Sequence, residues 1–287
     1  MTRESQPAPS STAGWDHYPA LDALYRSWIG PHLHHGLWLT PTESLPRAQQ
    51  NLEDRVLTAL GPLSGRHVWD IGCGYGTLAR RLHREGAASV TGFNPQAQQL
   101  PSDPAIHWRA QAWPPPLSEM AAPAPDALVF LESLEHMPDP PTALCSAATV
   151  LSPAGRLVIA SLLPSHFPDP LLRRTLPLAR YSLHLPPVQE IVRHLDALGF
   201  SSIHVTDLTT AVRPTWPHLI RAMGRRALHH PLQTLRWAAS HPAHGLRFAL
   251  GSLAFWHHLH SSRLRYVLIV ADHAPDRTHC SMEKATG

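Results

Sequence analysis

The sequence is poor in charge, lysine and cysteine. Charged residues make up 16% of the 287 positions, against about 25% in ordinary globular domains, and nearly all basic residues are arginine. A formal net charge of +3 gives no electrostatic reason to expect nucleic acid as a partner. The three cysteines are widely spaced and form no CxxC pair, which argues against a disulfide framework or a structural zinc site and fits a reducing cytoplasm.

Long apolar runs are also missing. No segment approaches the ~20 consecutive apolar residues that a membrane-spanning helix needs. Residues 1–14 are small and polar, without an apolar stretch after the first charges, so we expect a disordered N-terminus and no signal peptide. These features predict a cytoplasmic protein, and they leave its oligomeric state open.

Apolar strands alternate with helical segments along most of the chain, and a hydrophobic share of 43% is enough for a sizeable core. This alternation predicts an α/β fold with a Rossmann-like, doubly wound, seven-stranded and mostly parallel sheet. We expect a helical cap over 15–60, the sheet domain over 61–272 and a tail over 273–287. The expected strands are 66–71, 88–93, 105–108, 126–131, 156–162, 202–207 and 265–271, and the expected helices are 16–29, 44–60, 76–85, 140–151 and 187–198.

Two segments interrupt the alternation. Residues 163–186 are rich in proline, and residues 213–262 combine Trp, Leu, Arg and His over a length too great for a simple connection. Because ligands bind at the carboxyl ends of the strands in this architecture, both segments are predicted to form a helical lid there. The arginines of 213–262 fit either an ordinary solvated face or contact with an anionic membrane surface.

A glycine turn follows the first strand in the stretch VWDIGCGYG, residues 68–76. Gly72, Gly74 and Gly76 alternate behind the acidic Asp70, and a helix follows them. An acid at this position repels a pyrophosphate and attracts the ammonium group of a bound amino acid. The turn therefore favours S-adenosylmethionine over a dinucleotide.

The same stretch resembles motif one of class I S-adenosylmethionine-dependent methyltransferases. HHGLW (34–38), VTGFN (90–94), LESLEHM (131–137) and LSPAGRL (151–157) follow in the order known from that class. Together they resemble the subgroup of tocopherol methyltransferases, alkaloid and natural-product methyltransferases, and cyclopropane-fatty-acid synthases. The resemblance implies methyl transfer to carbon, nitrogen or oxygen of a small, aromatic or lipophilic molecule.

The resemblance also implies the cofactor site. Asn94 stands where an acid usually holds the ribose hydroxyls, and Gln111 where an acid usually meets adenine, with Trp113 either over the adenine or in the core. Only eleven residues separate Asn94 from Ile106, so a helix between the second and third strands has to be very short or the strand assignment is off. The residues expected at the cofactor are Asp70, Gly72, Cys73, Gly74, Gly76, Asn94, Gln99, Gln111, Ala112 and Glu132.

Catalysis is expected just beyond the fourth strand. By resemblance to alkaloid N-methyltransferases, His136 is the candidate general base and Glu135 orients it or holds a cationic substrate; the alternative is that His136 caps the next helix. The resemblance places His34, His35 and Trp38 over cofactor and substrate, although a purely structural loop is equally compatible with them. Trp216 is expected at the substrate as part of the lid.

No metal is expected, because the histidines at 229–230 and 257–260 lack carboxylate or cysteine partners at ligand spacing. Two other functions stay open. Asn94 and Gln111 in place of acids are compatible with a regulatory protein that binds S-adenosylmethionine without turnover. The third hypothesis is a synthase that modifies acyl chains.

Overall fold

The computed structural model describes residues 26, 30–116, 123–166, 169–175, 186–240 and 242–274. The expected N-terminal disorder, nearly all of the helix predicted at 16–29, much of 163–186 and the tail beyond residue 274 lie outside these residues.

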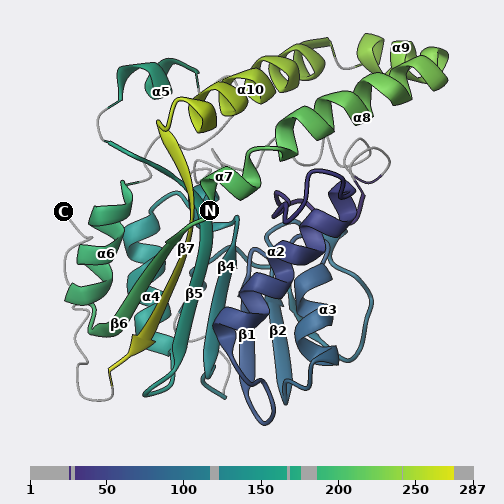
Figure 1. Ribbon diagram of the computed structural model, residues 1–287. Helices are drawn as coiled ribbons and strands as arrows, with labels where there is room; N and C mark the ends of the chain where they lie inside the picture. The colour runs from purple at the N-terminus through teal and green to yellow at the C-terminus, as the bar shows by residue number, and fades with distance from the viewer. Residues whose placement is uncertain are drawn as a thin grey trace, which may run out of the picture.

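One sheet of seven strands forms the centre of the molecule, in the order β3-β2-β1-β4-β5-β7-β6 (Figure 1). The first five strands are parallel, and β7 pairs antiparallel with both β5 and β6. The predicted Rossmann-like, doubly wound, mostly parallel sheet is thus confirmed. The strands are β1 (His67–Ile71), β2 (Ser89–Phe93), β3 (His107–Arg109), β4 (Ala127–Leu131), β5 (Arg156–Pro164), β6 (Phe200–Asp207) and β7 (Leu264–His273).

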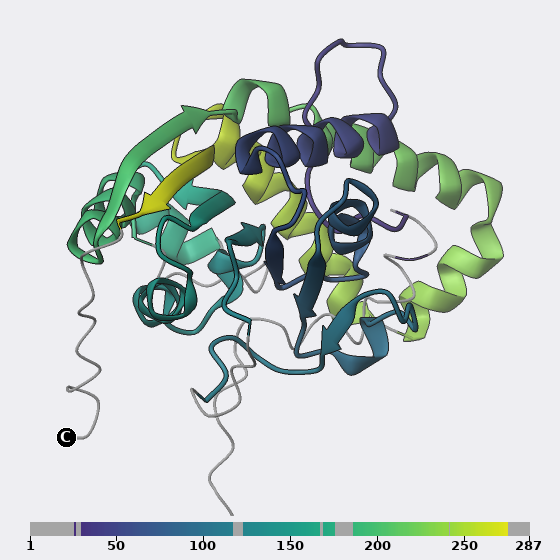
Figure 2. The same cartoon turned by 90° about the horizontal axis from the view of Figure 1, so that it is seen from below.

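Helices cover both faces of the sheet, and alternate residues of each central strand enter different cores. Val129 of β4 packs with α2 (Leu45–Leu60) and α3 (Thr77–Arg84), whereas Phe130 packs with α4 (Pro140–Val150) and α6 (Val188–Ala197). Figure 2 shows the sheet with α2, in purple, on one side. The period of two along a strand explains why β4 is apolar at every position, since both of its faces are buried.

Helix ends follow their sequence signals. Ser44 accepts a hydrogen bond from the backbone N–H of Arg47 and begins α2, and Gly61, at φ +75°, ends it. Asp139 begins α4, because its side chain accepts a hydrogen bond from the backbone N–H of Thr142. The N-cap of α4 is therefore Asp139, and the alternative that His136 caps this helix is wrong.

The connection from β2 to β3 holds only a three-residue 3₁₀ turn, η2 (Ala97–Gln99). Of the two explanations for the short spacing, the very short helix is the correct one. β3 is itself only three residues long and pairs with Thr91–Phe93, so little crossover length is required at this edge of the sheet.

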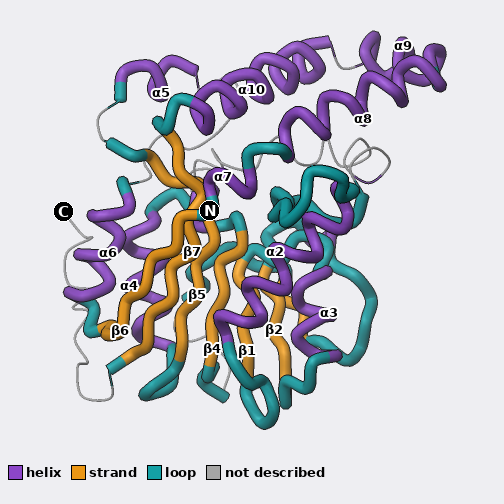
Figure 3. Tube along the Cα trace, viewed as in Figure 1, coloured by secondary structure: helices purple, strands orange, loops and turns teal. Residues whose placement is uncertain are grey.

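Four helices between β6 and β7 form a helical arm: α7 (Thr209–Val212), α8 (Thr215–His229), α9 (Pro231–Ser240) and α10 (Pro242–His260). The arm lies beyond the carboxyl end of β5, because Pro164 pairs with Leu264 just after α10 (Figures 1 and 3). The short α5 (Pro170–Thr175) contacts α10. In the described part of the chain, no helix is long and apolar enough to cross a membrane.

Two cysteines fall within the described residues. Cys73 is a buried free thiol, and burial raises its pKa well above the ordinary value. Cys145 on α4 is disulfide-bonded, although the wide spacing of the cysteines argued against a disulfide framework.

Candidate active site

The glycine turn leaves β1 in a conformation that favours glycine. Gly72 has φ +77° and Gly76, the N-cap of α3, has φ +70°. A Cβ atom on Gly72 would overlap the side chain of Ser133, so the turn and the segment after β4 touch here. The backbone N–H groups of Gly72 and Cys73 both donate to the carbonyl of Phe93, at 2.8 and 2.9 Å, which fixes the turn against β2.

Asp70 lies beneath this turn and is almost completely buried. Burial raises the pKa of its carboxyl to about 7, and the negative charge of Glu53 adds to the shift. The backbone N–H of Ala79 bonds the carboxylate, but its Oδ2 has no hydrogen-bond partner among the described residues. A buried carboxylate oxygen without a donor is costly, and a cationic ligand would supply the missing partner.

Asn94 and Gln99 stabilise the turn from β2. The side-chain amide of Asn94 donates to the carbonyl of Gly74 and to Oε1 of Gln99, both at 3.0 Å. Its Oδ1 accepts from the backbone N–H of Gln96. The predicted ribose-binding amide is thus engaged in local structure, and only the second lone pair of Oδ1 remains for a hydroxyl.

The residues after β3 separate into two groups. Trp113 is buried in the core against Trp69 and Phe93, and its Nε1 donates to the carbonyl of Ala143. Of the two roles considered for Trp113, core packing is the one observed. Gln111 is half-buried and Ala112 is exposed, at the same edge of the sheet as Asn94.

Residues 31–38 connect the glycine turn to the helical arm. Leu33 lies against Gly74, since a Cβ there would come 3.1 Å from its Cδ1 atom. At the other end, the backbone N–H of Gly36 donates to Thr215 Oγ1 on α8 at 3.1 Å, and the backbone N–H of Trp38 donates to the carbonyl of Ala211. This segment carries no helix or strand, yet it is held at both ends.

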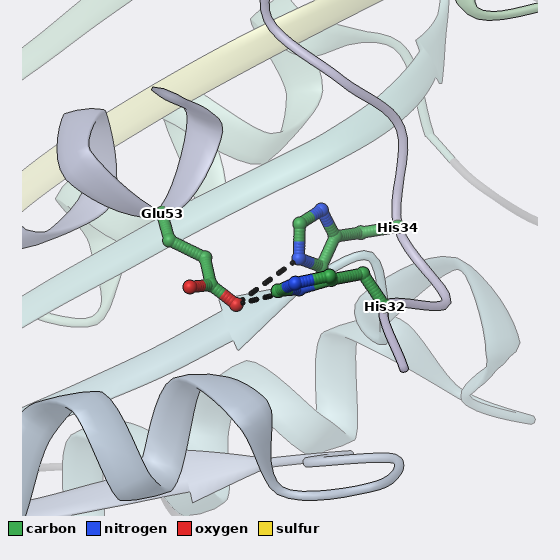
Figure 4. Close-up of side chains that lie close together, drawn as sticks. All are labelled: His32, His34 and Glu53. Atoms are coloured by element: carbon green, nitrogen blue, oxygen red, sulfur yellow. Dashed lines mark hydrogen bonds and ion pairs between the residues drawn. The ribbon is translucent and has the colours of Figure 1, made fainter. Parts of the chain in front are cut away.

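A buried ion-pair cluster joins this segment to α2, as Figure 4 shows, and also to α3. Oε1 of Glu53 lies 3.0 Å from His32 Nδ1 and 3.4 Å from His34 Nε2, and Oε2 lies 3.2 Å from Arg81. Burial alone would raise the pKa of Glu53, but its hydrogen bonds to both histidines lower it strongly. Burial disfavours protonation of His34, yet its bond to Glu53 and the nearby acids outweigh this and raise its pKa.

His32, His34 and Glu53 also offer three ligand atoms within 4.8 Å of one another, which could hold a metal ion. The hydrogen bonds favour an ion pair instead. His34 Nδ1 lies 2.8 Å from the carbonyl of His35, an acceptor, so Nδ1 carries a proton. Nε2 then needs a second proton to face Glu53 attractively. The charge of Arg81 on the same carboxylate further disfavours a cation.

A second acid, Glu132, lies directly after β4 and gathers donors from two other elements. Its Oε1 accepts from the backbone N–H of His35 at 2.7 Å and from the hydroxyl of Tyr266 on β7 at 2.8 Å. Its Oε2 lies 2.8 Å from Nδ1 of His35. Burial would raise the pKa of Glu132, but the charge and hydrogen bonds of His35 lower it, so Glu132 is a carboxylate.

Glu135 and His136 occupy the 3₁₀ turn η4 (Leu134–His136). Glu135 is completely buried, and its Oε2 accepts from Ser161 of β5 at 2.7 Å. Glu135 therefore links η4 to β5, a central strand of the sheet. His136, the next residue, is half-buried.

Aromatic rings surround His35 on the side of the arm. Trp216 of α8 meets the His35 ring edge-on, with 5.4 Å between centroids. It also stacks on Phe255 of α10 at an interplanar angle of 3°. The predicted residues His35, Glu132 and Trp216 thus come together, while Trp38 packs on His218, with ring centroids 3.9 Å apart.

Sequence reasoning missed Glu53, Tyr266, Phe255 and Thr215. Glu53 carried one usable signal, an acid inside an otherwise amphipathic helix. The other three lie in segments remote in sequence, and nothing in the local pattern marks them.

A family profile described as a methyltransferase domain matches residues 46–245. The chain belongs to this methyltransferase family. It is 31% identical over 229 residues to "O-methyltransferase cnsE" of Penicillium expansum, covering 74% of this chain and 79% of that protein. It is 30% identical over 224 residues to "27-O-demethylrifamycin SV methyltransferase" of Amycolatopsis mediterranei (strain S699), covering 74% and 81%.

Among solved structures, mycolic acid cyclopropane synthase CmaA1 complexed with S-adenosylhomocysteine superposes with a TM-score of 0.77 at 16% identity. That comparison covers 93% of this chain and 100% of the other. It shows the shared fold. The methyltransferase is thus a class I enzyme that uses S-adenosylmethionine on small molecules, as its sequence resemblance implied.

Proposed function

We propose that this methyltransferase transfers a methyl group to a hydroxyl oxygen of a small aromatic or lipophilic molecule. One relative named above is called an O-methyltransferase, and the other a methyltransferase of 27-O-demethylrifamycin SV. The observation that carries the proposal is the group of His35, Trp216 and Phe255 beside Glu132, because apolar rings next to hydrogen-bonding groups are what a small aromatic or lipophilic alcohol requires of its binding site.

The cofactor would lie over the glycine turn. S-adenosylmethionine, when bound, supplies an electrophilic methyl group on a sulfonium. Oδ2 of Asp70 fits its ammonium, because this buried oxygen lacks a donor in the described part of the chain. Gly72, Cys73, Gly74 and Gly76 bring the backbone close. The other residues assigned to cofactor contact are Asn94, Gln99, Gln111, Ala112 and Glu132.

The reaction breaks the sulfur–methyl bond, forms an oxygen–methyl bond and releases the hydroxyl proton, so a base is needed. His136 stays the base proposed from the sequence, since it lies just past the carboxyl end of β4. Its partner Glu135 would act through the bond to Ser161, which holds η4 against β5. His34 and Trp38 would keep residues 31–38 over cofactor and substrate.

The helical arm supports a second, separate proposal, that it rests on an anionic membrane surface. Leu228, Leu232 and Leu235 are exposed by 81%, 71% and 65%. Their spacing places them near one another where α8 meets α9, and Arg225 and Arg236 flank them, both exposed. Exposed leucines beside arginines fit a lipid interface, through which a lipophilic acceptor would arrive.

Formation of S-adenosylhomocysteine tests the main proposal. The purified enzyme is incubated with S-adenosylmethionine and a panel of phenols, aliphatic alcohols and amines, and product formation is followed by mass spectrometry. Acceptor-dependent turnover with hydroxyl compounds is expected. Methylation confined to amines or carbon acids would overturn the oxygen assignment, and His136→Gln tests the proposed base in the same assay.

A further inference from the structure

The side chain of His35 is oriented by an acid in the way that catalytic bases are. Glu132 is a carboxylate and can only accept, so the proton of the 2.8 Å contact belongs to Nδ1 of His35. In the neutral ring, Nε2 then carries the lone pair. Carboxylate, imidazole and a free ring nitrogen in line are the arrangement that lets a histidine take a proton.

The far nitrogen of this ring is left without a partner. His35 is 8% exposed, and its Nε2 is buried with no hydrogen bond among the described residues. The same holds for Nε1 of Trp216, the ring that meets His35 edge-on. One nitrogen is an acceptor and the other a donor. A hydroxyl group between them could donate to His35 and accept from Trp216.

The acid that holds His35 is maintained at a cost. Glu132 has φ +49°, a left-handed conformation that is strained for a residue other than glycine. Three hydrogen bonds hold its carboxylate, two from His35 and one from Tyr266. Strain of this kind persists only where surrounding contacts enforce it. Here the enforcing contacts are the hydrogen bonds that also orient the imidazole of His35.

The position relative to the glycine turn is also suitable. Glu132 precedes Ser133, whose side chain lies against Gly72 and whose Oγ donates to the carbonyl of Ile71. His35 follows Leu33 by two residues, and Leu33 lies on Gly74. The imidazole is thus held between the cofactor turn and the helical arm.

We infer that Nε2 of His35 is the atom that accepts the proton of the acceptor hydroxyl, with Glu132 and Tyr266 as the groups that position it. The inference rests on the proposed function and moves the base role from His136 to His35. The hydroxyl oxygen gains the methyl group, its proton passes to Nε2, and S-adenosylhomocysteine leaves. Because Nε2 is buried in this structure, a side chain around the ring has to move when an acceptor enters.

The first test needs no acceptor. The protein is labelled with ¹⁵N-histidine, saturated with S-adenosylhomocysteine and studied by long-range ¹H–¹⁵N NMR, with the His35 signals assigned from their loss in His35→Gln. We expect the proton on Nδ1 and none on Nε2 at pH 8, with the preference lost in Glu132→Gln. A proton on Nε2, or an unchanged spectrum in Glu132→Gln, would overturn the inference.

The second test compares turnover with catechol as the acceptor probe. His35→Gln should lower turnover by roughly 10²–10⁴-fold, as expected for a lost base, with the KM for S-adenosylmethionine little changed. Imidazole added to His35→Ala should restore part of the activity. His204→Gln, an exposed position on β6, is the matched control.

The outcomes separate the two proposals. A large loss in His136→Gln with none in His35→Gln overturns the inference and keeps the proposed function. If no hydroxyl compound is methylated by the unaltered enzyme, the proposed function fails, and the NMR result decides the state of His35.

Discussion

At the scale of single residues, the carboxyl of Asp70 links cofactor binding to pH. Burial, with the charge of Glu53, raises its pKa from an ordinary 3.8 to about 7, so we expect protonation of the free protein there to increase as the pH falls to 6. A bound ammonium favours the carboxylate. Affinity for S-adenosylhomocysteine should therefore fall, and proton release on binding should grow, as the pH drops below 7.

Asp70→Asn should weaken that binding by roughly 10- to 100-fold at pH 8, which corresponds to the 1.5–3 kcal/mol of a hydrogen bond to a charged group. It should also flatten the pH dependence. Calorimetry at pH 6 and pH 8 measures both, with Glu190→Gln on the surface of α6 as control. Unchanged affinity of the Asp70→Asn variant at pH 8 would show that the carboxylate does not meet the ammonium.

Gly72 makes the second prediction at this scale. Its φ of +77° and its contact with Ser133 both oppose a side chain. Gly65 has φ +76° but nothing within 4 Å of an added Cβ. Both alanine variants should lose about 1 kcal/mol of stability from the backbone, but only Gly72→Ala should lose S-adenosylhomocysteine binding. Urea unfolding measures the loss of stability from backbone strain, and calorimetry measures the loss of binding from the steric effect. Equal S-adenosylhomocysteine binding by both variants would contradict the steric effect at Gly72.

At the scale of elements, the Glu53 cluster fixes residues 31–38 to α2 and α3. Glu53→Gln leaves His34 and Arg81 without their buried anion and should cost roughly 3–5 kcal/mol. Asp54→Asn removes the other, half-exposed acid on the same Arg81 and should cost at most about 1 kcal/mol. Urea denaturation measures both, and equal losses would refute the difference.

The cluster also predicts a pH dependence with a definite sign. The pKa of His34 is raised, so the stability it contributes is complete below the ordinary value of 6.5 and is lost as pH rises through the raised value. The difference in unfolding free energy between the unaltered protein and Glu53→Gln should thus be larger at pH 6 than at pH 9. A difference that grows with pH would mean that His34 faces Glu53 uncharged.

At the scale of the whole molecule, the arm's exposed leucines predict membrane binding. We expect co-sedimentation with vesicles that contain phosphatidylglycerol, weaker pelleting with phosphatidylcholine alone, and loss of binding in the triple variant Leu228→Gln, Leu232→Gln, Leu235→Gln. Leu39→Gln is the control, because Leu39 is 66% exposed but lies outside the arm. If the triple variant still pelleted with these vesicles, the membrane-binding surface would lie elsewhere on the protein.

The sequence by itself determined the sheet, the glycine turn and the cofactor, because each depends on local patterns. The strands are short apolar runs, and Asp70, Gly72, Gly74 and Gly76 are neighbours in the chain. Counting residues reduced the step from β2 to β3 to two alternatives, and the structure decided for the very short helix. Local order also supplied the carboxyl-edge residues Glu132, Glu135 and His136.

Only the tertiary structure decided which of those residues work together. His35, Glu132, Trp216 and Tyr266 come from four segments. The residue numbers of His35 and Glu132 differ by 97, and those of Glu132 and Tyr266 by 134, so no local sequence pattern predicts these contacts. The same holds for Glu53, whose charge is buried only because α2 packs beside residues 31–38. Packing also decided the roles of Trp113 and Asn94. The ring of Trp113 lies in the core, and the amide of Asn94 donates to the carbonyl of Gly74 in the glycine turn.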